Sequence, residues 1–162
     1  MALGKALQTL KREIQRGVNR DAYAMTRRAA LRIVNDLQTK GPYWDGLFYH
    51  AWEVRAGDVT IPADQEGVMK SSDTAQPKPT SGAFALSDIP TQRVDYRSVP
   101  SLTIGNRMVY RDIALDLVPG RIKTEGGGTA EQDWYIRYYA GGEMDRAVGR
   151  AIKDTLNVPG ES

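Results

Sequence analysis

Residues Leu3 to Pro42 read LGKALQTLKREIQRGVNRDAYAMTRRAALRIVNDLQTKGP, which is the strongest local pattern in this chain of 162 residues. Apolar side chains recur every three or four residues, as one face of an α-helix requires. They are Leu3, Leu7, Leu10, Ile14, Val18, Ala22, Met25, Ala29, Ile33 and Leu37. We expect this face to pack on the core, with Leu10, Ile14 and Ile33 buried. Proline cannot continue the hydrogen-bond ladder of a helix, so Gly41-Pro42 ends it.

The middle of this helix contains three weak helix formers, Gly17, Asn19 and Asp21. Residues of this kind favour caps and bends over helix interiors. We therefore expect a kink or a break between residues 17 and 21, with Asn19 or Asp21 as a candidate cap.

The same segment is the basic part of the chain. Residues 1–40 carry nine Lys or Arg against three Asp or Glu, a net charge of +6, whereas the remaining residues carry 13 against 17, a net charge of −4. Such a helix can be a solvated face, can meet the acidic body of a neighbouring copy, or can bind nucleic acid. If copies pack head to tail, the candidate contacts are Arg12, Arg16, Arg20, Arg27 and Arg28 on the basic side and Asp112 and Asp116 on the acidic side.

Length and composition bound the class of protein. The chain fits a single domain over residues 1–162, with a short tail at 157–162. It has no cysteine, which excludes disulfides, thiol nucleophiles and thiolate metal sites. No window approaches 18 apolar residues, and the N-terminus lacks the pattern of a signal peptide. We therefore expect a soluble protein that is made in the cytoplasm and has no membrane partner.

The remaining regular segments predict a small antiparallel sheet and a second helix. Residues 47–54 alternate and are rich in aromatics, which is typical of a strand, and residues 59–61 are its continuation or partner. Residues 93–98 and 101–104 are further strand candidates, antiparallel because no crossover helix separates them. A second amphipathic helix is predicted over residues 143–156. The predicted fold is α+β, with both helices packed on the sheet.

Three other segments are less regular. Residues 108–118 predict a short helix that stops at Pro119-Gly120, and residues 134–139 fit a helix and a strand equally well. The insertion at 62–88 and the segment at 121–132 are polar and rich in Gly or Pro. We expect both to be long loops that are mobile in the free subunit and become ordered against neighbours.

No group of residues assembles into a catalytic, cofactor or metal site. His50 is the single histidine, so it is better interpreted as a packed or interfacial residue than as a base. Asp112 and Asp116, four apart on a predicted helix, face solvent or a basic partner more readily than a metal ion. The glycines at 126–128 lack the Gly-Lys-Ser/Thr ending of a phosphate loop. We expect a protein that is not an enzyme and has no cofactor.

Aromatic residues cluster at 43–52 and at 134–139. The acidic neighbours of the first cluster, Asp45 and Glu53, argue against a base-stacking platform and for a core or a subunit interface. The second cluster, WYIRYYAGG, is typical of a docking patch. The candidate contact residues in the two clusters are Trp44, Trp52, Trp134 and Tyr138.

The order of motifs along the chain is the last observation. Lys40-Gly41 follows the long helix and leads into an aromatic-rich segment that ends at Ala51-Trp52-Glu53-Val54, and a later strand ends at Ile104-Gly105-Asn106. Tyr110 then opens a short helix, Gly120 closes it, and a polar loop and a C-terminal helix follow. This order resembles the tail-completion, or minor tail, proteins of tailed bacteriophages, which form part of the neck joining head to tail.

The resemblance implies a structural virion protein without catalytic activity. It implies a ring of identical subunits, a hexamer or a dodecamer, that contacts adjacent neck, connector and tail proteins, with DNA only passing through the ring lumen. It also adds Tyr110 to the candidate contact residues. The alternative is a nucleic-acid-binding module that uses the basic helix.

Overall fold

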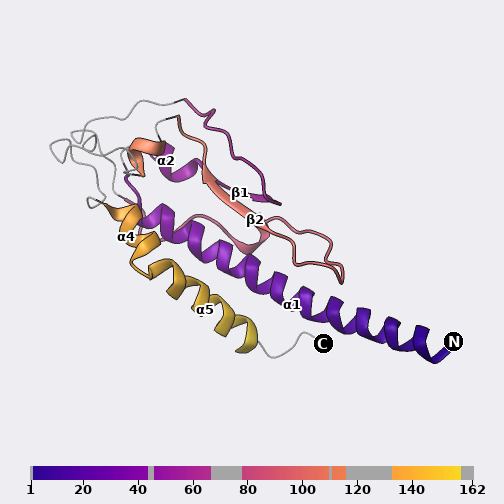
Figure 1. Ribbon diagram of the computed structural model, residues 1–162. Helices are drawn as coiled ribbons and strands as arrows, with labels where there is room; N and C mark the ends of the chain where they lie inside the picture. Colours follow the sequence, from indigo (N-terminus) through magenta and orange to yellow (C-terminus); the bar gives the residue numbers. More distant parts are fainter. Residues whose placement is uncertain (1, 44–45, 67–77, 110, 116–132, 158–162) are drawn as a thin grey trace, which may run out of the picture.

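The computed structural model of the protein describes residues 2–43, 46–66, 78–109, 111–115 and 133–157, and the structural statements below concern these residues. The main helices are α1 (Ala2–Lys40), α4 (Trp134–Ala140) and α5 (Glu143–Asn157). Shorter elements are α2 (Leu47–His50), η2 (Leu86–Asp88) and α3 (Arg111–Ala114). Strands β1 (Trp52–Ala56) and β2 (Leu102–Asn106) form a two-stranded antiparallel sheet. The predicted α+β fold is therefore confirmed, with α1 running between the β1–β2 sheet and α5 (Figure 1).

Helix α1 is continuous, so the break predicted between residues 17 and 21 is wrong, and neither Asn19 nor Asp21 caps a helix. Asn19 is buried, its amide nitrogen donates to Asp95 O at 3.0 Å, and its side-chain oxygen accepts from Gln15 Nε2 at 3.0 Å. An asparagine weakens a helix by bonding to the nearby backbone instead. Because its amide is satisfied by tertiary and helix-face partners, that competition is removed here.

Helix α1 ends at Gly41-Pro42 as predicted. Gly41 N donates to Leu37 O at 3.0 Å. A Cβ atom at position 41 would lie 2.8 Å from that oxygen, 3.1 Å from Trp134 and 3.2 Å from Phe48. Glycine thus allows the end of α1 to approach both α2 and α4 closely.

The two-stranded sheet matches the prediction over β1 and β2 but differs at residues 47–50, before β1. β1 pairs with β2 from Trp52 opposite Asn106 to Ala56 opposite Leu102, so the strand predicted at 101–104 is confirmed with slightly shifted bounds. The strand predicted at 47–54 is wrong over residues 47–50, which form the single turn α2. This turn buries both Phe48 and Tyr49, two adjacent residues that a strand would send to opposite faces.

Residues 59–61 and 93–98, also predicted as strands, form none. Their backbone groups find side-chain partners instead of a ladder: Val59 N donates to Thr103 Oγ1 at 3.3 Å, and Asp95 O accepts from Asn19 of α1. Buried backbone groups need partners, and side chains can supply them as well as a strand can.

Residues 78–90 lie on α1 of the same chain. Asn35 bonds both ways with Phe84, as its Nδ2 donates to Phe84 O at 3.1 Å and its Oδ1 accepts from Phe84 N at 3.0 Å. Ala83 N donates to Gln38 Oε1 at 2.8 Å, and Ile89 is 1% exposed. The expectation that the whole of 62–88 awaits a neighbour therefore does not fit residues 81–88, where backbone groups of several residues are hydrogen-bonded within the subunit. The residues at 67–77 and 121–132 lie outside the described ranges.

The C-terminal region is helical. The ambiguous segment 134–139 belongs to α4, which buries Trp134 and Tyr138 on one face four residues apart, and the helix predicted at 143–156 is confirmed as α5. Helix α5 lies alongside α1 in the opposite direction (Figure 1). Ion pairs join Lys40 to Glu143 and Arg32 to Asp154. Of the helix predicted at 108–118, α3 accounts for residues 111–114.

The core lies where the C-terminal half of α1 meets the β1–β2 sheet, α2 and α4. Its largest members are aromatic or long apolar side chains that are at most 6% exposed. They include Val34, Leu37, Phe48, Trp52, Met108, Trp134 and Tyr138. The N-terminal half of α1 contributes none of them.

Candidate assembly surfaces

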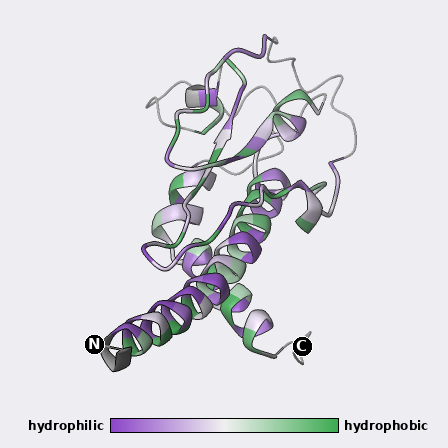
Figure 2. Cartoon of the chain, turned by 90° about the vertical axis from the view of Figure 1, so that its right-hand side faces the viewer, coloured by the Kyte–Doolittle hydropathy of each residue, from purple (hydrophilic) through white to green (hydrophobic). Residues whose placement is uncertain are grey.

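The N-terminal half of α1 extends beyond the rest of the subunit (Figure 1). We call residues 5–18 of α1 the arm, because the first side chain of α1 that is buried is Asn19. The stripe of apolar residues continues along the arm, where Leu7, Leu10, Ile14 and Val18 are 57–60% exposed. Hydrophobic and hydrophilic segments alternate along it in Figure 2.

The prediction that Leu10 and Ile14 are buried is therefore wrong, whereas Ile33 packs against the core. A hydrophobic period defines which face of a helix is apolar. It does not define how much of the helix has something to pack against.

The arm is also strongly basic. Its four basic residues, Lys5, Lys11, Arg12 and Arg16, stand against one acid, Glu13, which gives a net charge of +3. Glu13 pairs with Arg16 at 2.8 Å on the exposed surface. An apolar stripe flanked by positive charge fits a partner that is apolar and not itself basic.

The five arginines predicted as contacts divide into two kinds. Arg12, Arg16 and Arg20 lie on the arm or just after it, and Arg12 and Arg20 are exposed. Arg27 instead turns to its own chain, where Nη2 donates to Leu86 O and Ile89 O, both at 2.9 Å. Arg27 therefore holds residues 86–89 against α1, and its predicted contact with a neighbouring copy stays a prediction. Arg28 is partly buried at the edge of a polar hollow that also contains Arg32 and Asp154.

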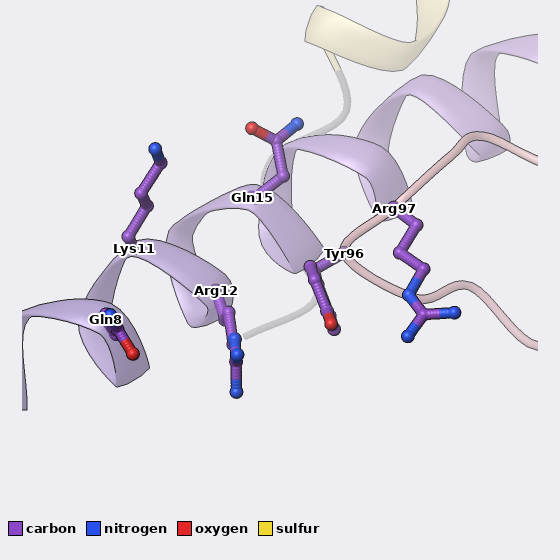
Figure 3. Close-up of a pocket in the computed structure, with 6 residues that line it drawn as sticks. All are labelled: Gln8, Lys11, Arg12, Gln15, Tyr96 and Arg97. Carbon is purple, nitrogen blue, oxygen red and sulfur yellow. The ribbon is translucent and has the colours of Figure 1, made fainter. Parts of the chain in front are cut away.

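A shallow basic hollow lies beside the arm, lined by Gln8, Lys11, Arg12, Gln15, Tyr96 and Arg97. The guanidinium carbons of Arg12 and Arg97 lie 5.3 Å and 5.7 Å from the Tyr96 ring centroid, with the two side chains on either side of the ring in Figure 3. The hydrogen bond from Arg97 and the positive charges lower the pKa of the Tyr96 hydroxyl. Asp95 is the acid next to the hollow, and backbone N–H groups of Arg97 and Ser98 lower its pKa.

An apolar groove opens at the other end of the subunit, between the C-terminal half of α1, the β1–β2 sheet and the α4–α5 pair. We call it the aromatic groove; its volume is about 250 Å³. It is lined by Ile33, Leu37, Trp52, Leu102, Ile104, Tyr135, Tyr138, Tyr139 and Met144. Tyr139, which is 61% exposed, stacks on Tyr135 with ring centroids 6.4 Å apart.

Two tyrosines of the aromatic groove, Tyr135 and Tyr138, have raised pKa values. Burial raises the pKa of Tyr135 above its ordinary value. The pKa of Tyr138 is raised further, by burial first and then by Asp36, whose Oδ2 accepts from the Tyr138 hydroxyl at 3.3 Å. Tyr135 and Tyr138 therefore carry no phenolate charge at any pH near neutral.

The aromatic contact residues predicted from sequence prove to be core residues where they are described. Trp52, Trp134 and Tyr138 are 2–6% exposed and belong to the hydrophobic core of their own subunit, which corrects their assignment as adhesive surface. Trp52 and Tyr138 still form part of the floor of the aromatic groove. Trp44, Tyr110 and Asp116 lie outside the described residues, and for Asp112 only its place in α3 is described.

Sequence reasoning did not name Tyr96, Arg97, Tyr139, Leu102 or Ile104 individually as contact residues, although Tyr139 belongs to the predicted WYIRYYAGG patch. Tyr96 and Arg97 lie in a coil that has no periodicity, so nothing local linked them to Arg12, 84 or more residues earlier. Tyr139 could have been found, because a helical interpretation of 134–139 places it one turn after Tyr135.

His50 is exposed at the end of α2, and its ring makes an edge contact with Tyr49, with centroids 4.9 Å apart. Within the described ranges, no three His, Cys, Asp or Glu side chains come together as a metal site would require. No helix in that part of the chain is both long and apolar enough to cross a membrane.

Comparison of the chain with protein-family models, with curated proteins and with solved structures finds no match.

Proposed function

We propose that this chain is a structural subunit of the neck of a tailed bacteriophage, where copies assemble into a hexameric or dodecameric ring that joins head to tail. The observation that carries the proposal is the arm, which holds four apolar side chains in solvent along one face. The order of motifs in the sequence supports the setting, a virion neck with connector and tail proteins on either side and DNA only in the lumen.

The arm has a thermodynamic reason to find a partner. Fully burying a Leu, Ile or Val side chain contributes about 1.5–3 kcal/mol, so covering side chains that are now more than half exposed yields about 1–2 kcal/mol each. Leu7, Leu10, Ile14 and Val18 lie in one row, and a contiguous apolar row of this kind is typical of an interaction site.

The position of the arm favours a contact between unlike surfaces. Two arms placed side by side would bring together two segments of net charge +3. An arm placed on the body of the next copy avoids this repulsion, and such head-to-tail contacts close into rings when the rotation between copies permits.

Mass measurement in solution over a range of concentrations, with electron microscopy of the largest species, tests this proposal. We expect the parent chain to form closed rings, alone or on mixing with adjacent virion proteins. The double variant Leu10→Asp/Ile14→Asp should remain folded and monomeric, while Val99→Asp, at an exposed residue that is not part of the arm, should assemble normally. A parent chain that stays monomeric under all these conditions would refute the proposal.

A second candidate function, binding to nucleic acid, is favoured by the basic hollow. Arg12, Lys11 and Arg97 gather there around a partly exposed tyrosine ring, a combination that suits phosphates and stacked bases. If this candidate is right, Arg12→Ala and Arg97→Ala should each weaken binding to a DNA duplex and reduce the dependence of log K on log salt by about one phosphate contact. Lys153→Ala on α5 serves as the control. Equal affinities for all three variants and the parent would exclude the basic hollow as a binding site.

A further inference from the structure

We infer that the aromatic groove of one subunit receives the arm of a neighbouring copy, so that Leu7, Leu10 and Ile14 pack against Leu102, Ile104 and Tyr139 of the next molecule. The inference rests on the proposed function, because it names the contact through which copies would assemble. It requires an apolar helix and an apolar site of matching character on the same chain, and both are present.

The subunit itself shows that this apolar stripe and this groove are compatible. Ile33 and Leu37 are the C-terminal members of the stripe that begins on the arm, and they form one wall of the aromatic groove. Tyr135 and Met144 pack on the same core beside them. The arm therefore presents apolar side chains of the same types that these α4 and α5 residues already cover within the subunit.

The arm that enters the groove must come from another molecule. Val18 and Ile33 belong to one uninterrupted helix and lie about 22 Å apart along its axis, at 1.5 Å per residue. A continuous helix cannot fold back on itself, and Figure 1 shows the arm and α4 at opposite ends of α1. Each subunit thus offers an arm at one end and an empty groove at the other, which is the arrangement that a head-to-tail contact needs.

Charge selects this groove over the other surfaces. The arm carries a net charge of +3, so the basic hollow with Lys11, Arg12 and Arg97 would repel it. The hollow around Arg28 and Arg32 offers charged walls to an apolar stripe. The aromatic groove is lined by apolar and tyrosine side chains, and the nearby Lys40 is paired with Glu143.

The direction of the arm is set before any partner arrives. Asn19 bonds to Asp95 O at 3.0 Å, Tyr23 bonds to Pro90 O at 3.0 Å, and Arg12 lies over the Tyr96 ring. These contacts hold the base of the arm to the body. A preorganised arm loses less conformational entropy on binding than a free one does.

Cysteine cross-linking tests the contact directly, because the parent chain has no cysteine. Leu10→Cys protein is mixed with Tyr139→Cys protein under mild oxidation, and the disulfide-linked pair is quantified on a non-reducing gel. Both positions are more than half exposed, so neither change should disturb folding. Val99→Cys, also exposed but outside the groove, replaces Tyr139→Cys as the control. We expect at least tenfold more of the Leu10–Tyr139 product than of the control product or of the Leu10–Leu10 homodimer.

A dominant Leu10–Leu10 homodimer would show that arms pair with arms and would overturn the inference, while leaving self-assembly intact. Equal yields at positions 139 and 99 would overturn it as well. Rings of the parent chain that form without any arm-to-groove product refute the inference alone, whereas a parent that never assembles refutes the proposed function too.

Charge substitution gives a second readout that needs no oxidation. Leu10→Asp and Tyr139→Asp should each weaken self-association at least tenfold, as measured by sedimentation, with unchanged circular dichroism. Combining them should add little, because either change alone removes the same contact. Fully additive losses, or a Tyr139→Asp protein that associates like the parent, would contradict the inference.

Discussion

Two buried amide side chains hold the short elements of this subunit in place. Gln38 donates from Nε2 to Tyr49 O and accepts at Oε1 from Ala83 N, both at 2.8 Å. Asn106 donates from Nδ2 to Phe48 O at 2.8 Å and accepts at Oδ1 from Met108 N at 3.0 Å. Because both ends of each amide are used and each residue is 2% exposed, the geometry of α2 is tightly specified although α2 is a single turn.

The two described tryptophans form a matched pair for testing hydrogen bonding in the core. Trp134 Nε1 donates to Ala114 O at 2.9 Å, whereas Trp52 Nε1 is buried without an acceptor among the described residues. Trp134→Phe leaves a buried carbonyl unpaired, and Trp52→Phe removes an unpaired donor. We expect Trp134→Phe to lower the free energy of unfolding by about 1–3 kcal/mol more than Trp52→Phe does, in urea titrations of dilute protein. Equal losses for the two variants would contradict this account.

The ion pair between Lys40 and Glu143 makes stability depend on pH in a defined direction. The hydrogen bond from Lys40 lowers the pKa of Glu143 in the folded state. Its contribution is therefore complete above the ordinary glutamate pKa of about 4.3, and it is lost as the pH falls through the lowered folded value.

Because Glu143 is more than a third exposed, solvent screens this pair. Glu143→Gln should lower the free energy of unfolding by only about 0–1 kcal/mol at pH 7. The difference from the parent should be smaller at about pH 3, which lies below the ordinary glutamate pKa of about 4.3, than at pH 7. Urea unfolding at the two pH values measures it, with Asp145→Asn in the same turn of α5 as control. A difference that grows toward low pH would have the wrong sign.

At the scale of elements, α1 is one helix with two environments. Residues 19–40 pack against the β1–β2 sheet, α4, α5 and the segment 78–90, and residues 5–18 form the arm. Apolar residues occur in both parts. Two leucines of this one helix, one in each part, therefore show how the surroundings change the contribution of a side chain to stability.

Leu37→Ala and Leu10→Ala measure that difference within one helix. Leu37 is 5% exposed, and its truncation should lower the free energy of unfolding by about 2–5 kcal/mol. Leu10 is 57% exposed, and its truncation should change stability by at most about 0.5 kcal/mol in the monomer. The titrations must use dilute protein, since association would add stability to the parent. A loss at Leu10 as large as that at Leu37 would mean that the arm is packed within the subunit.

The whole molecule combines a body that is complete by itself with a projecting arm. Every hydrogen bond between α1 and the rest of the described chain begins at Asn19 or later. Below Asn19, the arm meets the body at the basic hollow, where Arg12 lies over the partly exposed Tyr96 ring.

Deletion of residues 1–17 should therefore leave the body folded. We expect the free energy of unfolding to change by less than about 1 kcal/mol, because none of the side chains described at positions 5–17 is buried. The far-ultraviolet helical signal should fall by the share of the arm, and self-association should be lost. A deletion variant that no longer unfolds cooperatively would show that the arm is part of the core.

The sequence alone determined the features that depend on neighbours along the chain. The end of the long helix at Gly41-Pro42, the C-terminal helix predicted at 143–156 and the strand predicted at 101–104 follow from periodicity and from the geometry of proline and glycine, whereas the break predicted at 17–21 is absent from the continuous α1. These signals act within a few residues, so no tertiary information is needed to recognise them.

Tertiary structure alone decided where those elements have partners. Residues 47–50 became a helical turn because Gln38 and Asn106 satisfy its carbonyl groups, and α4 became a helix whose buried face carries Trp134 and Tyr138. The burial of Leu37 and the exposure of Leu10 depend on where the body ends, and a period of 3.6 residues contains no information about that. The aromatic groove likewise arises only where side chains from α1, the β1–β2 sheet and α4–α5 meet. Its lining residues Ile33 and Met144 are more than 100 residues apart in the chain.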